Sequence, residues 1–228
     1  MRQLQKMSLE INQIIRSRRK TIALVIQKDG ALIVRAPLRA PEKFIREFAE
    51  KNAQWILKKQ AQMRAAVSLP PRQYASGETF FYLGREVPLE IVKGQKLALV
   101  LDPHFKLAES AVGHAEKVFQ RWYREQAREI ISERVLLFAE RHNLQYQKIR
   151  IGSARTRWGS CNAKGGLSFS WRLILTPMEI VDYVVVHELA HTLVHNHSGK
   201  FWKQVERILP DYDERRKWLR RNGHKVML

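Results

Sequence analysis

Apolar residues in the first third of the chain follow a strand-like pattern that then changes to a helical one. Residues 21–27 and 31–37 are rich in alternating and β-branched apolar residues, which predicts two strands joined by a tight turn. From Pro41 to Leu57, apolar residues recur at helical spacing, which predicts a helix with one apolar and one basic face. A small antiparallel sheet is expected next from short apolar runs at residues 80–84, 88–92 and 96–102.

The second half of the chain alternates between helical and strand patterns. A long helix is predicted over residues 111–142, strands over residues 146–152 and 167–175, and helices again over the C-terminal third. This order predicts an α+β fold in which a helix packs on a small antiparallel or mixed sheet. We expect a boundary near residue 105, between a basic, β-rich N-terminal region (residues 1–105) and a mostly helical domain (residues 106–228).

The most specific chemical signal is the H-E-x-x-H motif formed by His187, Glu188 and His191. On an α-helix, two residues four positions apart lie on the same face, about 6 Å apart along the axis, so both imidazoles can reach one ion. Glu188 points roughly 100° away, where it can reach a metal-bound water without coordinating the metal. This is the zincin arrangement, in which two histidines hold Zn²⁺ and the glutamate is the general base.

The residues before the motif predict the start of a helix. Pro177 suits the first helical position, and Thr176 with Glu179 forms a candidate capping box. The apolar residues that follow would bury this helix in a core. The motif therefore lies on a helix, as its chemistry requires.

A catalytic zinc ion usually has three protein ligands and leaves one position for water. The candidates for the third ligand are His195 and His197. If the helix continued, His195 would lie about 12 Å along the axis from His187, too far to share an ion. If the chain turns at Asn196, His197 can fold back over the metal. We therefore predict His197 as the third ligand and His195 as a residue lining the pocket.

Around this motif the sequence resembles the YgjP-like metallopeptidases, a family related to the SprT-like and Wss-like (WLM) proteases. The resemblance implies a zincin-like metallopeptidase domain, metal ligands at His187, His191 and His197, and a catalytic Glu188. It also favours a long helix that turns at His195 and Asn196. Five segments carry the resemblance, in this order: residues 155–162, 171–177, 185–191, 196–202 and 209–223.

In zincin folds a strand before the active-site helix commonly forms the lip of the cleft, and residues 167–175 are placed for that role. A peptide substrate would add to the edge of this strand by main-chain hydrogen bonds. Arg157 and Trp158 would either line this cleft or form a packed turn. An oxyanion could be stabilised by Arg157, His195 or Tyr212, and the sequence does not choose among them.

The single cysteine, Cys161, allows two other interpretations, a nucleophile paired with a histidine or a fourth metal ligand. A fourth protein ligand would close the site to the water that hydrolysis needs. A lone cysteine is more often a small buried apolar residue, and we expect that role here.

Composition adds a strong positive charge. Lys and Arg number 41 against 22 Asp and Glu, which gives a formal net charge of +19, while 45% hydrophobic residues indicate a globular chain. This charge would attract phosphate polyanions and predicts non-specific association with nucleic acid or nucleotides. The lone cysteine and the lack of a signal peptide or a membrane span predict a soluble, cytoplasmic protein without membrane association. Clusters of basic residues occur at Arg16–Lys20, Lys58–Lys59, Arg215–Lys217 and Arg220–Arg221.

Three functions are compatible with these features. The favoured one is a zinc-dependent hydrolase that cleaves peptides or proteins, with another divalent ion as a possible replacement for zinc. The second is a metal-dependent hydrolase of nucleoside triphosphates, since a metal-activated water beside basic residues can also attack a phosphoanhydride. The third is a non-catalytic nucleic-acid-binding protein with a structural metal, although such a site would have no use for Glu188 as a base.

Overall fold

A computed structural model describes residues 10–27, 29–67 and 72–226 of the chain. It divides into two compact units, Met1–Arg72 and Gln73–Leu228. This division lies before the boundary that we expected near residue 105. The difference arises because residues 73–108 pack into the same core as the helical half. The fold is the expected mixed α+β arrangement, with small sheets and helices, and this prediction is confirmed.

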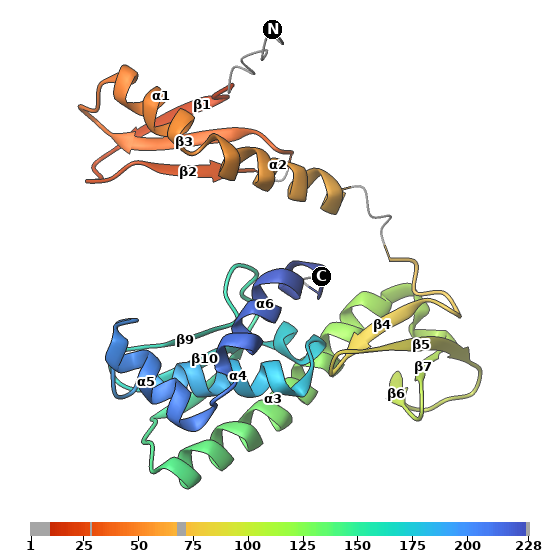
Figure 1. Ribbon diagram of the computed structural model, residues 1–228. Helices are drawn as coiled ribbons and strands as arrows, with labels where there is room; N and C mark the ends of the chain where they lie inside the picture. Colours follow the sequence, from red (N-terminus) through yellow and green to blue (C-terminus); the bar gives the residue numbers. More distant parts are fainter. Residues whose placement is uncertain (1–9, 28, 68–71, 227–228) are drawn as a thin grey trace, which may run out of the picture. The chain divides into compact units, whose positions relative to one another are not determined.

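The first unit is a three-stranded sheet with two helices packed against it (Figure 1). β3 lies in the centre, parallel to β1 and antiparallel to β2. The single helix expected after Pro41 is divided at Asn52, whose side-chain amide donates to the carbonyl of Phe48 and whose backbone leaves the helical conformation. The elements are β1 (Gln13–Ser17), β2 (Ala23–Ile26), β3 (Leu32–Pro37), α1 (Glu42–Lys51) and α2 (Ala53–Val67).

The second unit begins with a four-stranded sheet in the order β4-β5-β7-β6. We expected an antiparallel sheet, but β5 and β7 pair in parallel, because β7 turns back from β6 and lies between β6 and β5. An aromatic cluster joins this sheet to the long helix α3, with the rings of Phe80 and Phe119 stacked 4.3 Å apart. The elements are β4 (Thr79–Tyr82), β5 (Arg85–Val92), β6 (Leu99–Leu101), β7 (Phe105–Ala108), the 3-10 helix η1 (Glu109–His114) and α3 (Ala115–His142).

A second sheet of this unit carries the strands that precede the motif. It contains β8 (Lys148–Gly152), β9 (Gly159–Cys161) and β10 (Gly166–Ser170). β10 is central, parallel to β8 and antiparallel to β9. The strand predicted over residues 167–175 therefore ends at Ser170, and the chain continues as the 3-10 helix η2 (Trp171–Leu175). Because both edges of β10 are paired, our expectation that this strand offers a free edge is wrong. Within the described residues, β9 is the edge strand on that side.

The C-terminal part consists of three helices, α4 (Met178–Ala190), α5 (Gly199–Ile208) and α6 (Tyr212–Val226). α4 is buried on nearly all sides because it contacts α3, α5, α6 and β9. The expected capping box does not form. The Thr176 hydroxyl donates instead to the Leu173 carbonyl at 2.7 Å, and the helix is capped by Pro177 without a side-chain hydrogen bond. Packing of its apolar residues, rather than its cap, therefore holds α4 in place.

Candidate metal centre

Three histidines from α4 and the loop after it converge at the end of this helix. His187 lies in the last turn of α4, His191 directly follows the helix, and His197 lies on the loop before α5. Nε2 of His197 is 3.1 Å from Nε2 of His187 and 3.2 Å from Nε2 of His191. Ligand nitrogens around a tetrahedral zinc ion, each about 2.0–2.1 Å from the metal, are about 3.3 Å apart. The three imidazoles therefore have the spacing of a zinc site with a fourth position for water.

The α-helix before the loop that returns His197 ends earlier than we expected. α4 ends at Ala190, turns with helix-like hydrogen bonds continue to Val194, and the chain then bends at His195 and Asn196. The Nδ1 atom of His191 donates to the carbonyl of Val194 at 3.0 Å, which directs its Nε2 atom toward the other histidines. His195 is exposed and does not belong to the three-histidine group.

Burial keeps the imidazoles of His187 and His191 neutral. The pKa of His187 is lowered to about 3, mainly by burial and further by His191, His197 and Arg216. Burial also lowers the pKa of His191, although the hydrogen bond to Val194 acts in the opposite direction. Because only neutral imidazole binds a metal ion, the site can receive a cation at neutral pH without first releasing protons from these two residues.

Aromatic side chains of α4 and α5 pack against the rings of the histidines. Phe201 of α5 is fully buried, and its ring centroid lies 4.4 Å from that of His191 and 4.9 Å from those of His187 and His197. The ring of Tyr183, one turn before His187 on α4, lies 5.9 Å from that histidine, and burial raises its pKa to about 12. Neither contact was predicted from the sequence. The available signal for Phe201 was its place among the apolar residues of an amphipathic helix that begins two residues after His197.

Glu188 is buried beneath strand β9 and is only 5% exposed. Burial raises its pKa to about 7, and the positive charge of Arg157 partly offsets this effect. A Cβ atom built on Gly159 would lie 2.5 Å from Oε1 of Glu188. Glycine is therefore required where β9 crosses the carboxylate. A carboxyl group with a pKa near neutrality can both accept and return a proton.

Cys161 lies close to Glu188 but fits neither of the other interpretations. Burial, followed by the charge of Glu188, raises the pKa of its thiol. The thiol is therefore protonated at neutral pH, which is unfavourable for a nucleophile. It is also outside the three-histidine group, as is every aspartate and glutamate in the described part of the chain.

The other residues predicted for the site, Trp158, Tyr212 and Arg157, differ in what they contact. Trp158 packs against the core of the unit, where a Cβ atom on Gly223 of α6 would lie 3.0 Å from its ring. Tyr212 stacks on Trp202 at a centroid distance of 5.5 Å, and Trp202 in turn lies 5.7 Å from His197. Tyr212 is thus separated from the histidines by one ring, whereas Arg157 acts electrostatically on Glu188.

Comparison with known protein families gives a match over most of the chain. A family model described as YgjP-like, metallopeptidase domain, matches residues 20–222, which covers both compact units. A search of curated proteins returned no match to this chain. Among the described residues, none of the helices combines the length and apolar character needed to cross a membrane.

Proposed function

This chain belongs to the YgjP-like metallopeptidase family, and we propose that it hydrolyses peptide bonds with one zinc ion held by His187, His191 and His197. The observation that carries the proposal is the convergence of three Nε2 atoms at distances that suit a tetrahedral ion. A bound zinc ion would polarise the scissile carbonyl and lower the pKa of the attacking water. His191 is oriented for this role by its hydrogen bond to Val194, and Phe201 fixes the planes of the imidazoles.

Glu188 is the proposed general base. Its carboxylate takes a proton from the attacking water and can pass it to the leaving amine. A pKa of about 7 suits both transfers, because the group is then neither a very weak base nor a very weak acid at neutral pH. The carboxylate lies between its own helix α4 and strand β9. This restricts its movement, so the proton acceptor stays in one position.

Strand β9 is the proposed docking edge for the substrate. It is paired on one side with β10, and within the described residues no strand covers its other side. Gly159 of this strand contacts Glu188, so a peptide added to the edge would lie next to the general base. Main-chain hydrogen bonds along the edge would hold an extended peptide with little dependence on its sequence.

Metal analysis combined with a hydrolysis assay tests this function. Wild-type protein should bind zinc and cleave a denatured protein substrate. Glu188→Gln should retain zinc and lose about 10²–10⁴-fold in turnover. His187→Ala should lose stoichiometric zinc. Wild-type turnover by Glu188→Gln would exclude the base, and stoichiometric zinc in His187→Ala would exclude the ligand set.

Hydrolysis of nucleoside triphosphates is a second candidate. It is favoured by a group of arginines around the β8-β10-β9 sheet, among them Arg150 and Arg157, since guanidinium groups bind phosphate in bidentate geometry. The assay is phosphate or pyrophosphate release from each nucleoside triphosphate by wild type and Glu188→Gln. Release that depends on Glu188, without cleavage of any protein substrate, would establish this function instead.

A further inference from the structure

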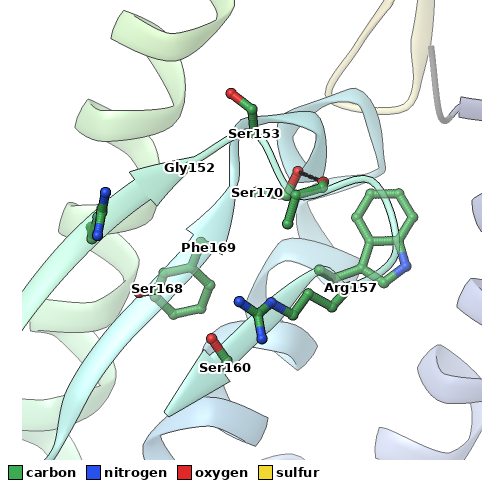
Figure 2. Close-up of a pocket in the computed structure, with 11 residues that line it drawn as sticks. Gly152, Ser153, Arg157, Ser160, Ser168, Phe169 and Ser170 are labelled. Atoms are coloured by element: carbon green, nitrogen blue, oxygen red, sulfur yellow. Dashed lines mark hydrogen bonds between the residues drawn. The ribbon is translucent and has the colours of Figure 1, made fainter. Parts of the chain in front are cut away.

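The outer face of the β8-β10-β9 sheet contains an open cavity of about 280 Å³ (Figure 2). It is lined by two arginines and by serines from the strands and their connecting loop: Arg150, Arg157, Ser153, Ser160, Ser168 and Ser170. Figure 2 shows Arg157 extending toward Ser160 and Phe169. Trp158, Phe169 and Ala154 add apolar surface, so the cavity combines polar groups with an apolar wall, as ligand pockets commonly do.

The strand register explains why these side chains gather. Arg150 of β8 is paired with Ser168 of β10, which is paired with Ser160 of β9, so the three residues form one row across the sheet. Their neighbours Leu167 and Phe169 point to the opposite face and are buried in the core. At Gly152 a Cβ atom would meet only a backbone oxygen at 3.9 Å. The missing side chain leaves the space above the sheet open.

The two arginines that line the cavity are not engaged in ion pairs with any residue that the structure describes. Among the described residues, neither Arg150 nor Arg157 has a carboxylate within ion-pair distance. Two further arginines hold the rim, since Arg124 donates to the Ser153 hydroxyl and Arg172 donates to the Ser153 carbonyl at 3.3 Å. The guanidinium groups of Arg150 and Arg157, which form no ion pair with the described part of the chain, can attract an anion to the cavity.

Hydroxyl groups complete a set of donors. Within the described part of the chain, the hydroxyls of Ser160 and Ser168 have no hydrogen-bond partner, whereas the Ser170 hydroxyl already donates to the Ala154 carbonyl at 2.8 Å. Two guanidinium groups and two available hydroxyls can therefore point to one anionic group.

The cavity borders the proposed active site through β9. Gly159 lines the cavity and also lies against Glu188, and the charge of Arg157 acts on the same carboxylate. Side chains of an extended peptide point alternately to the two faces of a sheet. A peptide added to β9 would therefore direct every second side chain toward the outer face, where the cavity lies.

We propose that this cavity is a specificity subsite for a carboxylate side chain of the substrate, so that the enzyme prefers Asp or Glu at a position next to the scissile bond. The proposal rests on the peptidase function proposed above. The lining residues come from strands and their connecting loop; only the five-residue 3-10 helix η2 begins next to them, directly after Ser170, and no α-helix begins among them. The cavity thus lacks the helix N-terminus that phosphate sites commonly use, whereas paired guanidinium groups match a carboxylate.

Peptide binding to full-length, zinc-loaded Glu188→Gln protein tests this subsite without requiring turnover. The probes are fluorescent nonapeptides of Ala and Ser with a single Glu or Gln placed at each position in turn. We expect Glu to bind about tenfold more tightly than Gln, or about 1.4 kcal/mol, at one position or at alternate positions only. Adding Arg150→Gln should bring this ratio close to one.

The matched control is Lys148→Gln, which removes the same charge from the same strand and the same face but lies outside the cavity lining. It should retain most of the preference for Glu. Circular dichroism of both variants verifies that the sheet is intact. Equal affinities for Glu and Gln peptides, or equal effects of the two substitutions, would overturn the proposal.

Two further outcomes separate this proposal from the proposed function. If wild type cleaves no peptide but the Glu preference and its dependence on Arg150 are present, the subsite is supported and the peptidase function fails. If a nucleoside triphosphate binds in an Arg150-dependent manner and the peptides show no preference, the cavity is a phosphate site and the carboxylate proposal is overturned.

Discussion

Glu188 should destabilise the metal-free protein at neutral pH, and its replacement by Gln should remove that penalty. The folded state raises the pKa of this carboxyl from 4.5 to about 7, chiefly through burial. At 1.36 kcal/mol per pKa unit, this difference corresponds to about 3 kcal/mol. Below pH 4.5 the carboxyl is protonated in both the folded and the unfolded state and carries no such cost. As the pH rises from 4.5 to about 7, this stability is progressively lost, because the unfolded state releases the proton more readily than the folded state.

The observable is the difference in unfolding free energy between Glu188→Gln and wild type at several pH values. Burial of the Gln amide has a cost of its own, but that cost does not vary with pH. The difference should therefore shift in favour of the variant by about 2.5 kcal/mol between pH 5 and pH 8. A variant that is inactive and yet more stable at pH 8 would show that the active site costs the protein stability.

Urea unfolding in the presence of a chelator measures this difference, because bound metal would neutralise the carboxylate. Intrinsic fluorescence reports mainly on the second compact unit, since Trp55 is the only tryptophan of the chain outside it. Glu206→Gln, at an exposed position of α5, is the control for removal of one carboxylate. A difference between Glu188→Gln and wild type that stays constant from pH 5 to pH 8 would refute the burial argument.

Three other substitutions test the site and its support. His197→Ala should weaken zinc binding by more than about 100-fold in a chelator competition assay, beyond the 10–100-fold typical for loss of a residue that only supports a ligand. Gly159→Ala should lower the unfolding free energy by about 1–3 kcal/mol and reduce turnover, because its Cβ atom would lie 2.5 Å from Glu188; unchanged melting and activity would contradict the close approach of β9. Phe201→Ala should cost about 3–5 kcal/mol in chemical denaturation and also reduce zinc affinity, whereas a loss of stability alone would mean that its ring does not position the imidazoles.

The sequence predicted the parts of the site that depend on local periodicity. The spacing of His187 and His191 follows from helix geometry, and the buried α4 follows from its continuous apolar residues. His197 was predicted as the third ligand because a turn after the helix can bring its imidazole back over the metal. The α-helix itself ends earlier than we expected, at Ala190, and the contacts of His191 with Val194 and Phe201 that accompany this end are not encoded in local periodicity.

Long-range pairing limited the prediction of the fold. β9 has the sequence Gly-Ser-Cys and shows no apolar pattern, so neither its existence nor its place at the sheet edge could be inferred. The structure divides after Arg72, whereas we expected a boundary near residue 105. This division depends on aromatic contacts such as that of Phe80 with Phe119, which are distant in sequence.

Because His197 lies on the loop between α4 and α5, metal binding is coupled to closure of this loop. Only five residues separate His191 from His197, so the loop holds the third imidazole near the other two at a high effective concentration. This is a chelate effect supplied by the backbone. By thermodynamic reciprocity, each interaction that keeps the loop closed, such as the contact of His197 with Phe201, raises metal affinity, and the metal in turn fastens α5 to α4. Removal of the metal should therefore first open the loop of residues 191–198, while the rest of the unit remains folded.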